Sequence, residues 1–266
     1  MSVGRIRTMD DKDNGAERLR TRYLSDADMA FVYSEYPESR GRGWCPSCDG
    51  TSESCDHELQ RQMFKHFAAA GIGQTYMRIG MADCAFPDDL SDALRSYLAQ
   101  PRAHRENGIG VCLLGSNGIG KTTAVSMLCK ALVAMGESVF FTTYEKLVSM
   151  LGDTFYDADA KRRYNEKILR SSFLAIDDIG KEFSNRLTQN AIDNVLRERV
   201  QASRPTFITS NMTKRELFHE YGRASFSLIV EGSVIFEMTG RGDVRAAVNR
   251  ERLDRARHGV IPPITL

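Results

Sequence analysis

Apolar residues follow two spacings in the middle and C-terminal parts of the chain. Short apolar runs fit buried strands, and runs with apolar residues every three or four positions fit amphipathic helices. The predicted strands lie at 111–114, 138–143, 173–176, 204–211 and 233–238, and the predicted helices at 123–135, 144–151, 184–202 and from 213 onward. Strands that alternate with helices form a parallel sheet with helices on both faces, so an α/β fold is expected.

Upstream of this region the spacing predicts further helices. One follows Glu58 and stops at Gly71, and another spans 89–100 and ends at Pro101, with a polar loop over 102–108 before the first strand. Residues 1–40 mix both signs of charge with a weakly helical pattern, and predict a flexible or partner-binding arm. The expected organisation is an arm over 1–40, a cysteine-rich segment and linker helix over 41–75, a main domain over 76–258 and a tail over 259–266.

A phosphate-binding motif joins the first strand to the next helix. It has the pattern G-x-x-x-x-G-K-[ST] of a P-loop, whose backbone N–H groups surround phosphates while Lys121 neutralises their charge and the Thr122 hydroxyl binds Mg²⁺. The start of the helix adds its positive dipole end. We expect ATP to bind at nine residues: Gly115, Ser116, Asn117, Gly118, Ile119, Gly120, Lys121, Thr122 and Thr123.

Two carboxylates end the predicted strand at 173–176, in the form of a Walker B element. Asp177 is expected to hold Mg²⁺ and Asp178 to polarise the attacking water. Asn211 ends a neighbouring strand and is expected to orient that water, since ligands bind at the carboxyl ends of parallel strands. Together with the P-loop, these residues predict ATP hydrolysis with ATP and Mg²⁺ as cofactors.

Three cysteines and a histidine follow the arm with the spacing C-x2-C-x6-C-x-H, formed by Cys45, Cys48, Cys55 and His57. Four such ligands close a tetrahedral Zn²⁺ site, and a segment poor in apolar residues gains stability from a metal. Incidental thiols are the alternative, and a disulfide fits a reducing compartment less well. Cys84, Cys112 and Cys129 stand singly and are interpreted as small buried residues.

Basic and aromatic residues alternate in a polar insertion over 153–170. Basic side chains can bind the phosphates of a single strand and aromatic side chains can stack on its bases, so the insertion suits single-stranded DNA. A solvated helix face with its tyrosine packed underneath is an equally good interpretation. The predicted DNA-contacting residues are Phe155, Tyr156, Lys161, Arg162, Arg163 and Tyr164.

Composition sets limits on these interpretations. A chain of 266 residues with 42% hydrophobic residues can form one substantial core and a small appendage. The net charge of +1 excludes a protein that coats nucleic acid over its whole surface, so any DNA contact is local. No apolar run is long enough to span a membrane, and residues 1–22 are too polar for a signal peptide. A cytoplasmic location without membrane contact is expected.

These motifs together resemble a known family, the AAA+ helicase loaders of the DnaC/DnaI type, particularly the versions carried by phages with a short cysteine knuckle. The resemblance covers about Cys45 to Arg245. It rests on the cysteine motif, the linker Ala70–Gly73, the P-loop, the sequences Ile176–Gly180 and Thr209–Asn211, and the segment Gly240–Arg245. The related IstB transposition ATPases share several of these motifs but generally lack the knuckle.

The resemblance implies a function and partners. Such a protein uses ATP to engage a hexameric replicative helicase and to help place it on single-stranded DNA during replication, and its ATPase domain self-assembles. The N-terminal region would contact the helicase, and residues 155–164 the DNA. Asn211 would be sensor 1, and Arg245 would be the sensor 2 arginine that contacts the γ-phosphate.

One departure from the family pattern concerns the arginine that reaches the ATP of a neighbouring subunit. Relatives carry Ser-Arg or Asp-Arg before the last strand, whereas this chain has Ser227-Leu228. Arg223, one helical turn away, is the candidate substitute, with a surface role as its alternative. Because an arginine finger contributes about 10³-fold or more in rate, its loss would predict slow hydrolysis.

Two other functions compete with the loader. An IstB-like helper ATPase of transposition shares the nucleotide motifs. An ATP-gated replication adaptor with little turnover agrees with the Leu228 departure.

Overall fold

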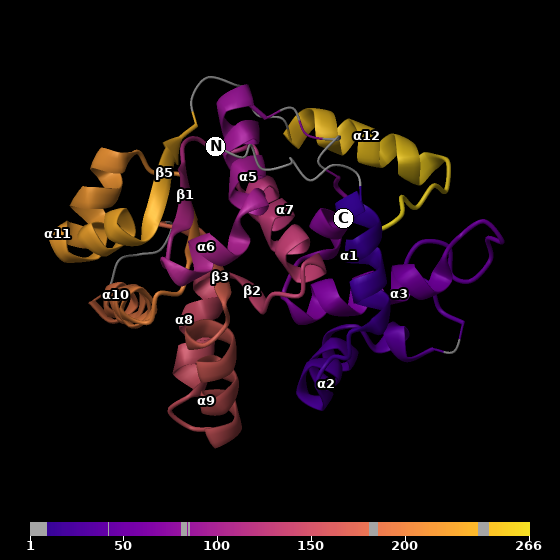
Figure 1. Cartoon of the computed structure of the whole chain (residues 1–266), viewed down its shortest axis with the longest axis horizontal. Helices are drawn as coiled ribbons and strands as arrows, with labels where there is room; N and C mark the ends of the chain where they lie inside the picture. The colour runs from indigo at the N-terminus through magenta and orange to yellow at the C-terminus, as the bar shows by residue number, and fades with distance from the viewer. Residues whose placement is uncertain (1–9, 42, 81–83, 85, 181–185, 239–244) are drawn as a thin grey trace, which may run out of the picture.

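Five parallel strands form the centre of the protein in the computed structural model, which describes residues 10–41, 43–80, 84, 86–180, 186–238 and 245–266 (Figure 1). The strands are β1 (Gly110–Leu114), β2 (Val139–Thr143), β3 (Phe173–Ile179), β4 (Thr206–Ser210) and β5 (Ser233–Glu237). Their order in the sheet is β2-β3-β4-β1-β5, and all neighbours run parallel. This arrangement confirms the predicted α/β fold of the AAA+ type and each predicted strand.

Side chains from each strand alternate between the two faces of the sheet, as the two-residue period of a strand requires. Val111 and Leu113 of β1 enter one hydrophobic cluster with helix α7 (Lys121–Ala134). Cys112 and Leu114 enter the other. That second face is covered by α8 (Tyr144–Asp153), α10 (Arg186–Gln201) and α11 (Lys214–Gly232). Strands β1 to β4 are therefore buried on both faces, which explains their largely apolar residues, whereas the edge strand β5 is partly exposed.

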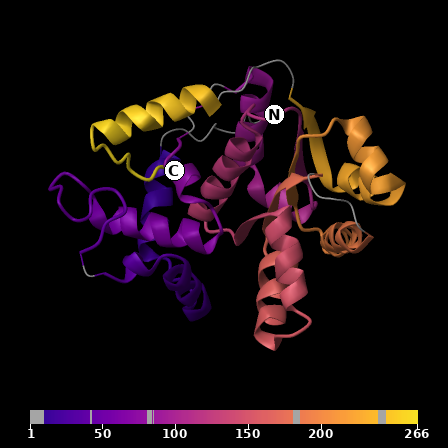
Figure 2. The same cartoon turned by 180° about the vertical axis from the view of Figure 1, so that it is seen from behind.

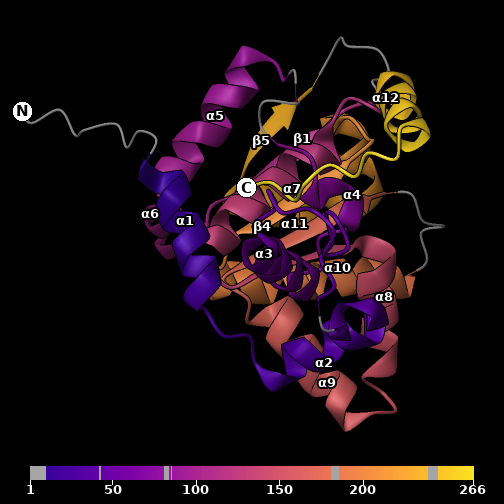
Figure 3. The same ribbon diagram turned by 90° about the vertical axis from the view of Figure 1, so that its right-hand side faces the viewer.

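The N-terminal part of the chain packs against the P-loop side of the sheet. Helices α1 (Asp10–Thr21), α2 (Asp26–Glu35) and α3 (His57–Ala69) follow one another there, with the short 3-10 helix Pro37–Arg40 after α2 (Figure 3). Leu19 and Val32 are completely buried in the cluster that contains α7. In the described part of residues 1–40 we therefore observe packed helices, in a segment where the sequence showed a weakly helical pattern and predicted a flexible or partner-binding arm.

Arginine side chains explain part of this packing. Arg18 donates to the carbonyl of Met135 over 3.1 Å, and Arg22 donates to the carbonyls of Val133 and Glu137 over 3.3 and 3.4 Å. These carbonyls belong to the end of α7 and the turn after it, where helix carbonyls lack partners within the helix. Helix α1 thereby attaches to the helix that begins at the P-loop, by contacts that hydrophobic periodicity does not reveal.

The linker after α3 adds to the edge of the sheet. The N–H of Phe141 in β2 donates to the carbonyl of Ala70 over 2.7 Å. Gly71 has a φ of 77°, and a Cβ there would lie 2.1 Å from the Phe141 carbonyl oxygen. Only glycine permits this approach, so the linker partly covers the exposed edge of β2. The short helix α4 (Gln74–Met77) follows.

Helix α5 (Asp88–Ala99) lies close to its predicted position, but the segment after it is helical and not a loop. Pro101 is the first residue of α6 (Pro101–Glu106). Proline fits the first position of a helix because its missing N–H would have no partner there. Pro101 thus begins a second helix where we expected only the end of the first.

The end of the chain runs back across the N-terminal helices. After α12 (Arg245–Arg257), the backbone of Ile264 makes two hydrogen bonds with Gln60 of α3, at 2.7 and 3.1 Å. The N–H of Thr265 donates to the carbonyl of Met77 over 3.0 Å. The buried ammonium of Lys130 in α7 donates to the Thr265 carbonyl over 2.9 Å. Residues 260–266 thus connect α3, α4 and α7, and we call them the tail strap.

Helices α8 and α9 (Ala158–Tyr164) extend beyond the sheet, as Figure 2 shows from behind. A π-helical turn, Asn165–Leu169, leads from α9 back to β3. The completely buried guanidinium of Arg199 donates to the carbonyls of Ile168 and Ser171, over 2.9 and 3.0 Å. These bonds fix the base of the projection, which we call the α8–α9 arm. Among the described helices, none is long and apolar enough to cross a bilayer.

Candidate functional site

The predicted nucleotide-binding residues meet at the carboxyl ends of β1, β3 and β4. The loop Gly115–Gly120 connects β1 to α7, whose first residue is Lys121 and whose first turn contains Thr122 and Thr123. Ser116 and Asn117 are exposed, Gly118 is buried, and Ile119 packs against the hydrophobic cluster beneath. The loop therefore presents its backbone at the start of a helix, where N–H groups and the helix dipole favour phosphate.

Gly115 shows why the loop requires glycine. Its φ is 136°, and a Cβ there would lie 2.3 Å from the carbonyl oxygen of Met238 and 2.8 Å from the side chain of Ile119. The N–H of Met238 donates to the carbonyl of Leu114 over 2.8 Å, which keeps that neighbouring segment in place. A larger residue at 115 would push the loop away from the sheet.

Lys121 is almost completely buried, at 6% exposure, and its ammonium lies inside the loop. It donates to the carbonyls of Gly115 and Ser116 over 2.6 and 2.7 Å, and to Oδ1 of Asn211 over 2.9 Å. These three oxygens hold the ammonium inside the phosphate-binding loop, where its charge also acts on the Asp177 carboxyl.

Asp177 lies opposite the start of α7. The Thr122 hydroxyl lies 2.9 and 3.1 Å from its two oxygens, and the Thr209 hydroxyl donates to Oδ1 over 2.6 Å. Burial raises the pKa of the Asp177 carboxyl, while the hydrogen bonds from Thr209 and Thr122 act against that rise. A buried carboxylate beside a threonine hydroxyl is an oxygen donor set that suits Mg²⁺, which prefers hard oxygen ligands.

Asn211 forms hydrogen bonds with both Asp178 and Lys121. Nδ2 of Asn211 donates to Oδ1 of Asp178 over 2.5 Å, while Oδ1 of Asn211 accepts from Lys121. Asp178 has a φ of 66°, a left-handed backbone conformation that residues other than glycine rarely adopt. The pairing of β3 with β4 shifts register between Ile176 and Ile179 at the same place. The structure thus brings Lys121, Thr122, Asp177, Asp178 and Asn211 into one site.

The structure describes the side chain of only one of the two predicted arginines. Arg223 is exposed and follows Gly222, whose φ of 73° breaks α11 into two segments. Leu228 packs against the second hydrophobic cluster, and Ser227 is exposed. Arg245 is the first residue of α12, but its side chain and residues 239–244 lie outside the described residues.

The predicted metal ligands form a second cluster. Four ligand atoms lie within 4.8 Å of one another, one from each of Cys45, Cys48, Cys55 and His57. Sγ of Cys45 is 3.7 Å from Sγ of Cys55, and Sγ of Cys48 is 3.4 Å from Nδ1 of His57. Bonds of about 2.3 Å to a tetrahedral Zn²⁺ place two sulfurs about 3.8 Å apart. The four residues fit a metal, and His57 joins the three cysteines.

Contacts around the cluster support a metal site. Although desolvation acts in the opposite direction, hydrogen bonds from the Ser52 backbone, the Cys55 thiol and the Gly50 backbone lower the pKa of Cys48 to about 6, while burial and the neighbouring thiols raise the pKa of Cys55. Backbone donors of this kind stabilise the thiolate, which is the form that binds metal. Ser47 donates to Gln60 of α3, and Arg78 donates to the carbonyl of Pro46 over 2.5 Å. The cluster is thereby attached to the helical body.

The predicted DNA-contacting residues divide into two groups on the α8–α9 arm. Phe155 and Tyr156 are 75% and 94% exposed, and Lys161, Arg162 and Arg163 are also exposed. Tyr164, in contrast, is only 6% exposed and packs in the second hydrophobic cluster. The prediction that Tyr164 contacts DNA is therefore wrong for this conformation, because its ring fills the core beneath the arm.

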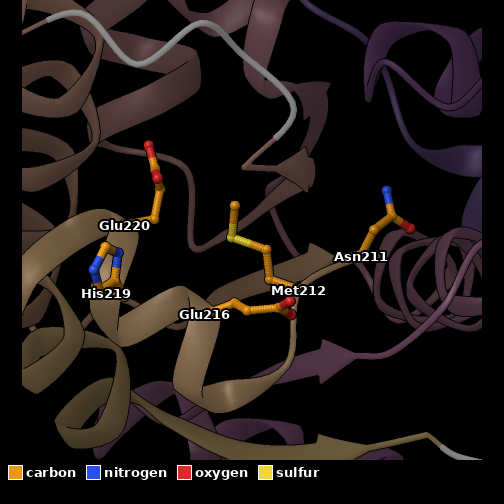
Figure 4. Close-up of a pocket in the computed structure, with 5 residues that line it drawn as sticks. All are labelled: Asn211, Met212, Glu216, His219 and Glu220. Atoms are coloured by element: carbon orange, nitrogen blue, oxygen red, sulfur yellow. The ribbon is translucent and has the colours of Figure 1, made fainter.

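An open pocket of about 340 Å³ borders the nucleotide site on the side of α11 (Figure 4). Asn211 and Met212 line it from the end of β4, and Glu216, His219 and Glu220 line it from α11. The sequence assigned Glu216 to a capping box with Thr213, and both of its hydrogen bonds are present. Helical spacing could have placed His219 and Glu220 on one face with Glu216, but it did not indicate a pocket beside Asn211.

Comparison with known proteins agrees with this geometry. Residues 81–227 match the family described as "IstB-like ATP binding protein". The replicative helicase loader DnaI of Bacillus subtilis is 26% identical over 154 residues, which are 56% of this chain and 48% of the relative. The replicative helicase loader DnaC of Escherichia coli K12 is 25% identical over 104 residues, 39% of this chain and 42% of the relative. The chain thus spans about half the length of the curated relatives it matches.

A solved structure shows the same fold. The crystal structure of the DnaC helicase loader superposes with a TM-score of 0.56 at 20% identity, covering 63% of this chain and all of that one. The predicted resemblance to loaders of the DnaC/DnaI type is thereby confirmed as a likeness in sequence and in fold.

Proposed function

The chain belongs to the family of IstB-like ATP-binding proteins, and from this we propose that it is an ATP-hydrolysing helicase loader. It would engage a hexameric replicative helicase and help to place it on single-stranded DNA during replication. The observation that carries the proposal is the convergence of Lys121, Asp177 and Asn211 in a protein similar to two replicative helicase loaders.

The nucleotide site would act as follows. N–H groups of the loop Gly115–Gly120 and the ammonium of Lys121 would bind the phosphates of ATP. Thr122 and Asp177 would hold Mg²⁺, which supplies charge neutralisation at the phosphates when bound. Asp178 would orient and polarise the attacking water. Asn211, hydrogen-bonded to both Lys121 and Asp178, would connect phosphate binding with the position of that water.

The cysteine cluster would hold Zn²⁺ through Cys45, Cys48, Cys55 and His57. Four protein ligands leave no position for substrate, so the metal would be structural. It would stabilise the segment between α2 and α3, which has few buried apolar residues of its own.

The proposed partners contact different surfaces. The N-terminal region would contact the helicase, and the exposed rings Phe155 and Tyr156, with the basic residues after them, would contact single-stranded DNA. The ATPase domain would self-assemble, with Arg223 reaching the ATP of a neighbouring subunit and Arg245 contacting the γ-phosphate of its own. The protein would act in the cytoplasm, or in the host cytoplasm if a phage encodes it.

Two other functions have particular support. The family description favours an IstB-like helper ATPase of transposition. The inward packing of Leu228, where relatives carry an arginine, favours an ATP-gated adaptor with little turnover.

Native mass spectrometry with the cognate replicative helicase tests the proposal. Wild-type protein and Lys121→Ala are each mixed with the helicase, with and without ATP. We expect a defined complex that responds to ATP in the wild type alone. A complex that ignores ATP in both proteins would contradict control by ATP, for the loader and for the ATP-gated adaptor alike, and the absence of any complex would contradict the loader and favour the transposition helper.

A further inference from the structure

A single buried hydroxyl, that of Thr209 in β4, joins the two consecutive aspartates of β3. It donates to Oδ1 of Asp177 over 2.6 Å and accepts the N–H of Asp178 over 2.8 Å. Thr209 is 1% exposed, so water cannot easily replace it in either bond. Both contacts therefore depend on this side chain.

The bond to Asp178 supports an unfavourable backbone. At a φ of 66° Asp178 lies in the left-handed region, which costs free energy in a residue other than glycine and persists only when surrounding contacts hold it. The Thr209 hydroxyl accepts the N–H of this residue. With the backbone so held, the Asp178 carboxylate contacts Asn211 at 2.5 Å.

The bond to Asp177 restricts the rotation of its carboxylate. Oδ1 lies near two hydroxyls, those of Thr209 and Thr122, whereas the structure gives Oδ2 one such neighbour, Thr122, at 3.1 Å. Fixing Oδ1 leaves Oδ2 as the oxygen with more lone-pair capacity, since a carboxylate oxygen accepts about two hydrogen bonds. Residues that orient a metal ligand in this way tune its affinity for the metal.

We propose that Thr209 is a positioning residue of the nucleotide site. Its hydroxyl sets the direction of the Asp177 carboxylate toward Mg²⁺ and holds the Asp178 backbone in the conformation that contacts Asn211. This inference rests on the proposed ATP-binding function, and it gives Thr209 a task that it performs through the two aspartates without touching the nucleotide.

The chain offers a matched control on the same strand. Thr206 is also buried in β4, and its hydroxyl accepts from Nε of Arg199 over 3.0 Å at the opposite end of the strand. Thr206→Val and Thr209→Val each remove one buried hydroxyl and keep the shape of the side chain. A purely structural role predicts similar effects for both variants, whereas the proposed role predicts a difference at the metal.

The experiment measures binding of a fluorescent, non-hydrolysable ATP analogue while Mg²⁺ is titrated, with thermal unfolding followed in parallel. For Thr209→Val we expect the half-saturating Mg²⁺ concentration to rise by about 10-fold or more, the usual effect of losing a partner of a metal ligand. Binding of the analogue without Mg²⁺ should stay at the wild-type level, because Lys121 and the loop are unchanged. Thr209→Ser, which keeps the hydroxyl, should restore the wild-type Mg²⁺ dependence.

Three results would decide against Thr209. The inference is overturned if Thr209→Val keeps the wild-type half-saturating Mg²⁺ concentration. It is also overturned if Thr206→Val raises that concentration as much as Thr209→Val does. If Thr209→Val does not fold, Thr209→Cys takes its place, since a thiol is a weak donor, and an unchanged Mg²⁺ dependence there overturns the inference as well. Failure of the proposed function is seen separately, as wild-type protein that does not bind the analogue at all.

Discussion

The ammonium of Lys121 and the amide of Asn211 form a hydrogen bond of 2.9 Å across 90 positions of sequence. The same amide donates to Asp178, so Asn211 contacts the ammonium of Lys121 and a carboxylate at once. A phosphate that attracts Lys121 would compete with Asn211 for the ammonium, and the amide would respond at Asp178. The residues proposed to bind phosphate and to orient water are therefore joined by hydrogen bonds through Asn211.

Lys121→Ala and Asn211→Ala should separate binding from turnover. Loss of Lys121 should weaken ATP-analogue binding by at least about 10-fold, since a hydrogen bond to a charged group is worth about 1.5–3 kcal/mol. Loss of Asn211 should mainly lower kcat, because its amide contacts Asp178. Isothermal titration and steady-state hydrolysis measure the two effects, and equal losses of affinity in both variants would contradict this division.

Removal of the metal should affect the cysteine cluster first. If the cluster holds zinc as proposed, Cys45→Ser should lower the zinc content and loosen residues 43–57, while the sheet stays folded because its hydrophobic clusters do not include the metal ligands. Elemental analysis with hydrogen exchange measures both effects. Cys84→Ser is the control, since Cys84 lies outside the cluster; unchanged zinc content in Cys45→Ser would contradict the site.

Stability should fall in mild acid because of His66. Burial, reinforced by the nearby charge of Arg22, lowers the pKa of His66 to about 4, and its Nε2 lies 3.2 Å from the carbonyl of Arg22. In the unfolded chain the His66 imidazole binds a proton below about pH 6.5, whereas in the folded chain it does so only below about pH 4. The free energy of unfolding should thus decrease by up to about 1.4 kcal/mol per pH unit between these values.

His66→Gln removes the titrating group and keeps an N–H donor for Arg22. Urea unfolding at pH 7, 6 and 5 should show a weaker pH dependence in this variant than in the wild type. Identical pH profiles would show that His66 does not determine the acid sensitivity.

The tail strap should contribute measurably to stability. Gln60→Leu leaves the N–H and carbonyl of Ile264, and the hydroxyl of Ser47, without their partner and should lower the free energy of unfolding by about 1–3 kcal/mol. Gln62→Leu is the matched control on the same helix, because Gln62 makes a local contact with Glu58 at 2.8 Å. Chemical denaturation that gives equal losses for both variants would mean that the strap adds little.

Mixing experiments test whether Arg223 acts between subunits. Arg223→Ala keeps its own nucleotide site, and Lys121→Ala keeps an intact Arg223. If the arginine acts in trans, each variant alone should hydrolyse ATP slowly, by up to about 10³-fold relative to wild type, and a mixture should regain activity. Normal turnover by Arg223→Ala alone would leave Arg223 as a surface residue.

Local patterns predicted the centre of the molecule well. Apolar runs located the five strands of the described chain, and the rule that parallel strands present their carboxyl ends at one edge brought Lys121, Asp177 and Asn211 together correctly. The spacing of Cys45, Cys48, Cys55 and His57 also predicted their approach. In these cases the information lies within a few residues of each site.

Features that depend on distant partners were not predictable in this way. Helix α1 attaches to α7 through arginines that contact backbone carbonyls, and any exposed-looking arginine could do so. Tyr164 shares a segment with exposed rings, but the core beneath it decides its burial. Thr209 lies in an apolar strand, and only the register of β4 against β3 shows that its hydroxyl meets both aspartates.

The pairing of Gln60 with Ile264 also has a consequence for protein synthesis. The two residues are 204 positions apart, and ribosomes add about 5–20 residues per second. Helix α3 therefore leaves the ribosome roughly 10–40 s before its partner exists. During that interval the surface of α3 that the strap later covers is open to chaperones and to other nascent chains, so residues 260–266 complete the packing of a helix that was made long before them.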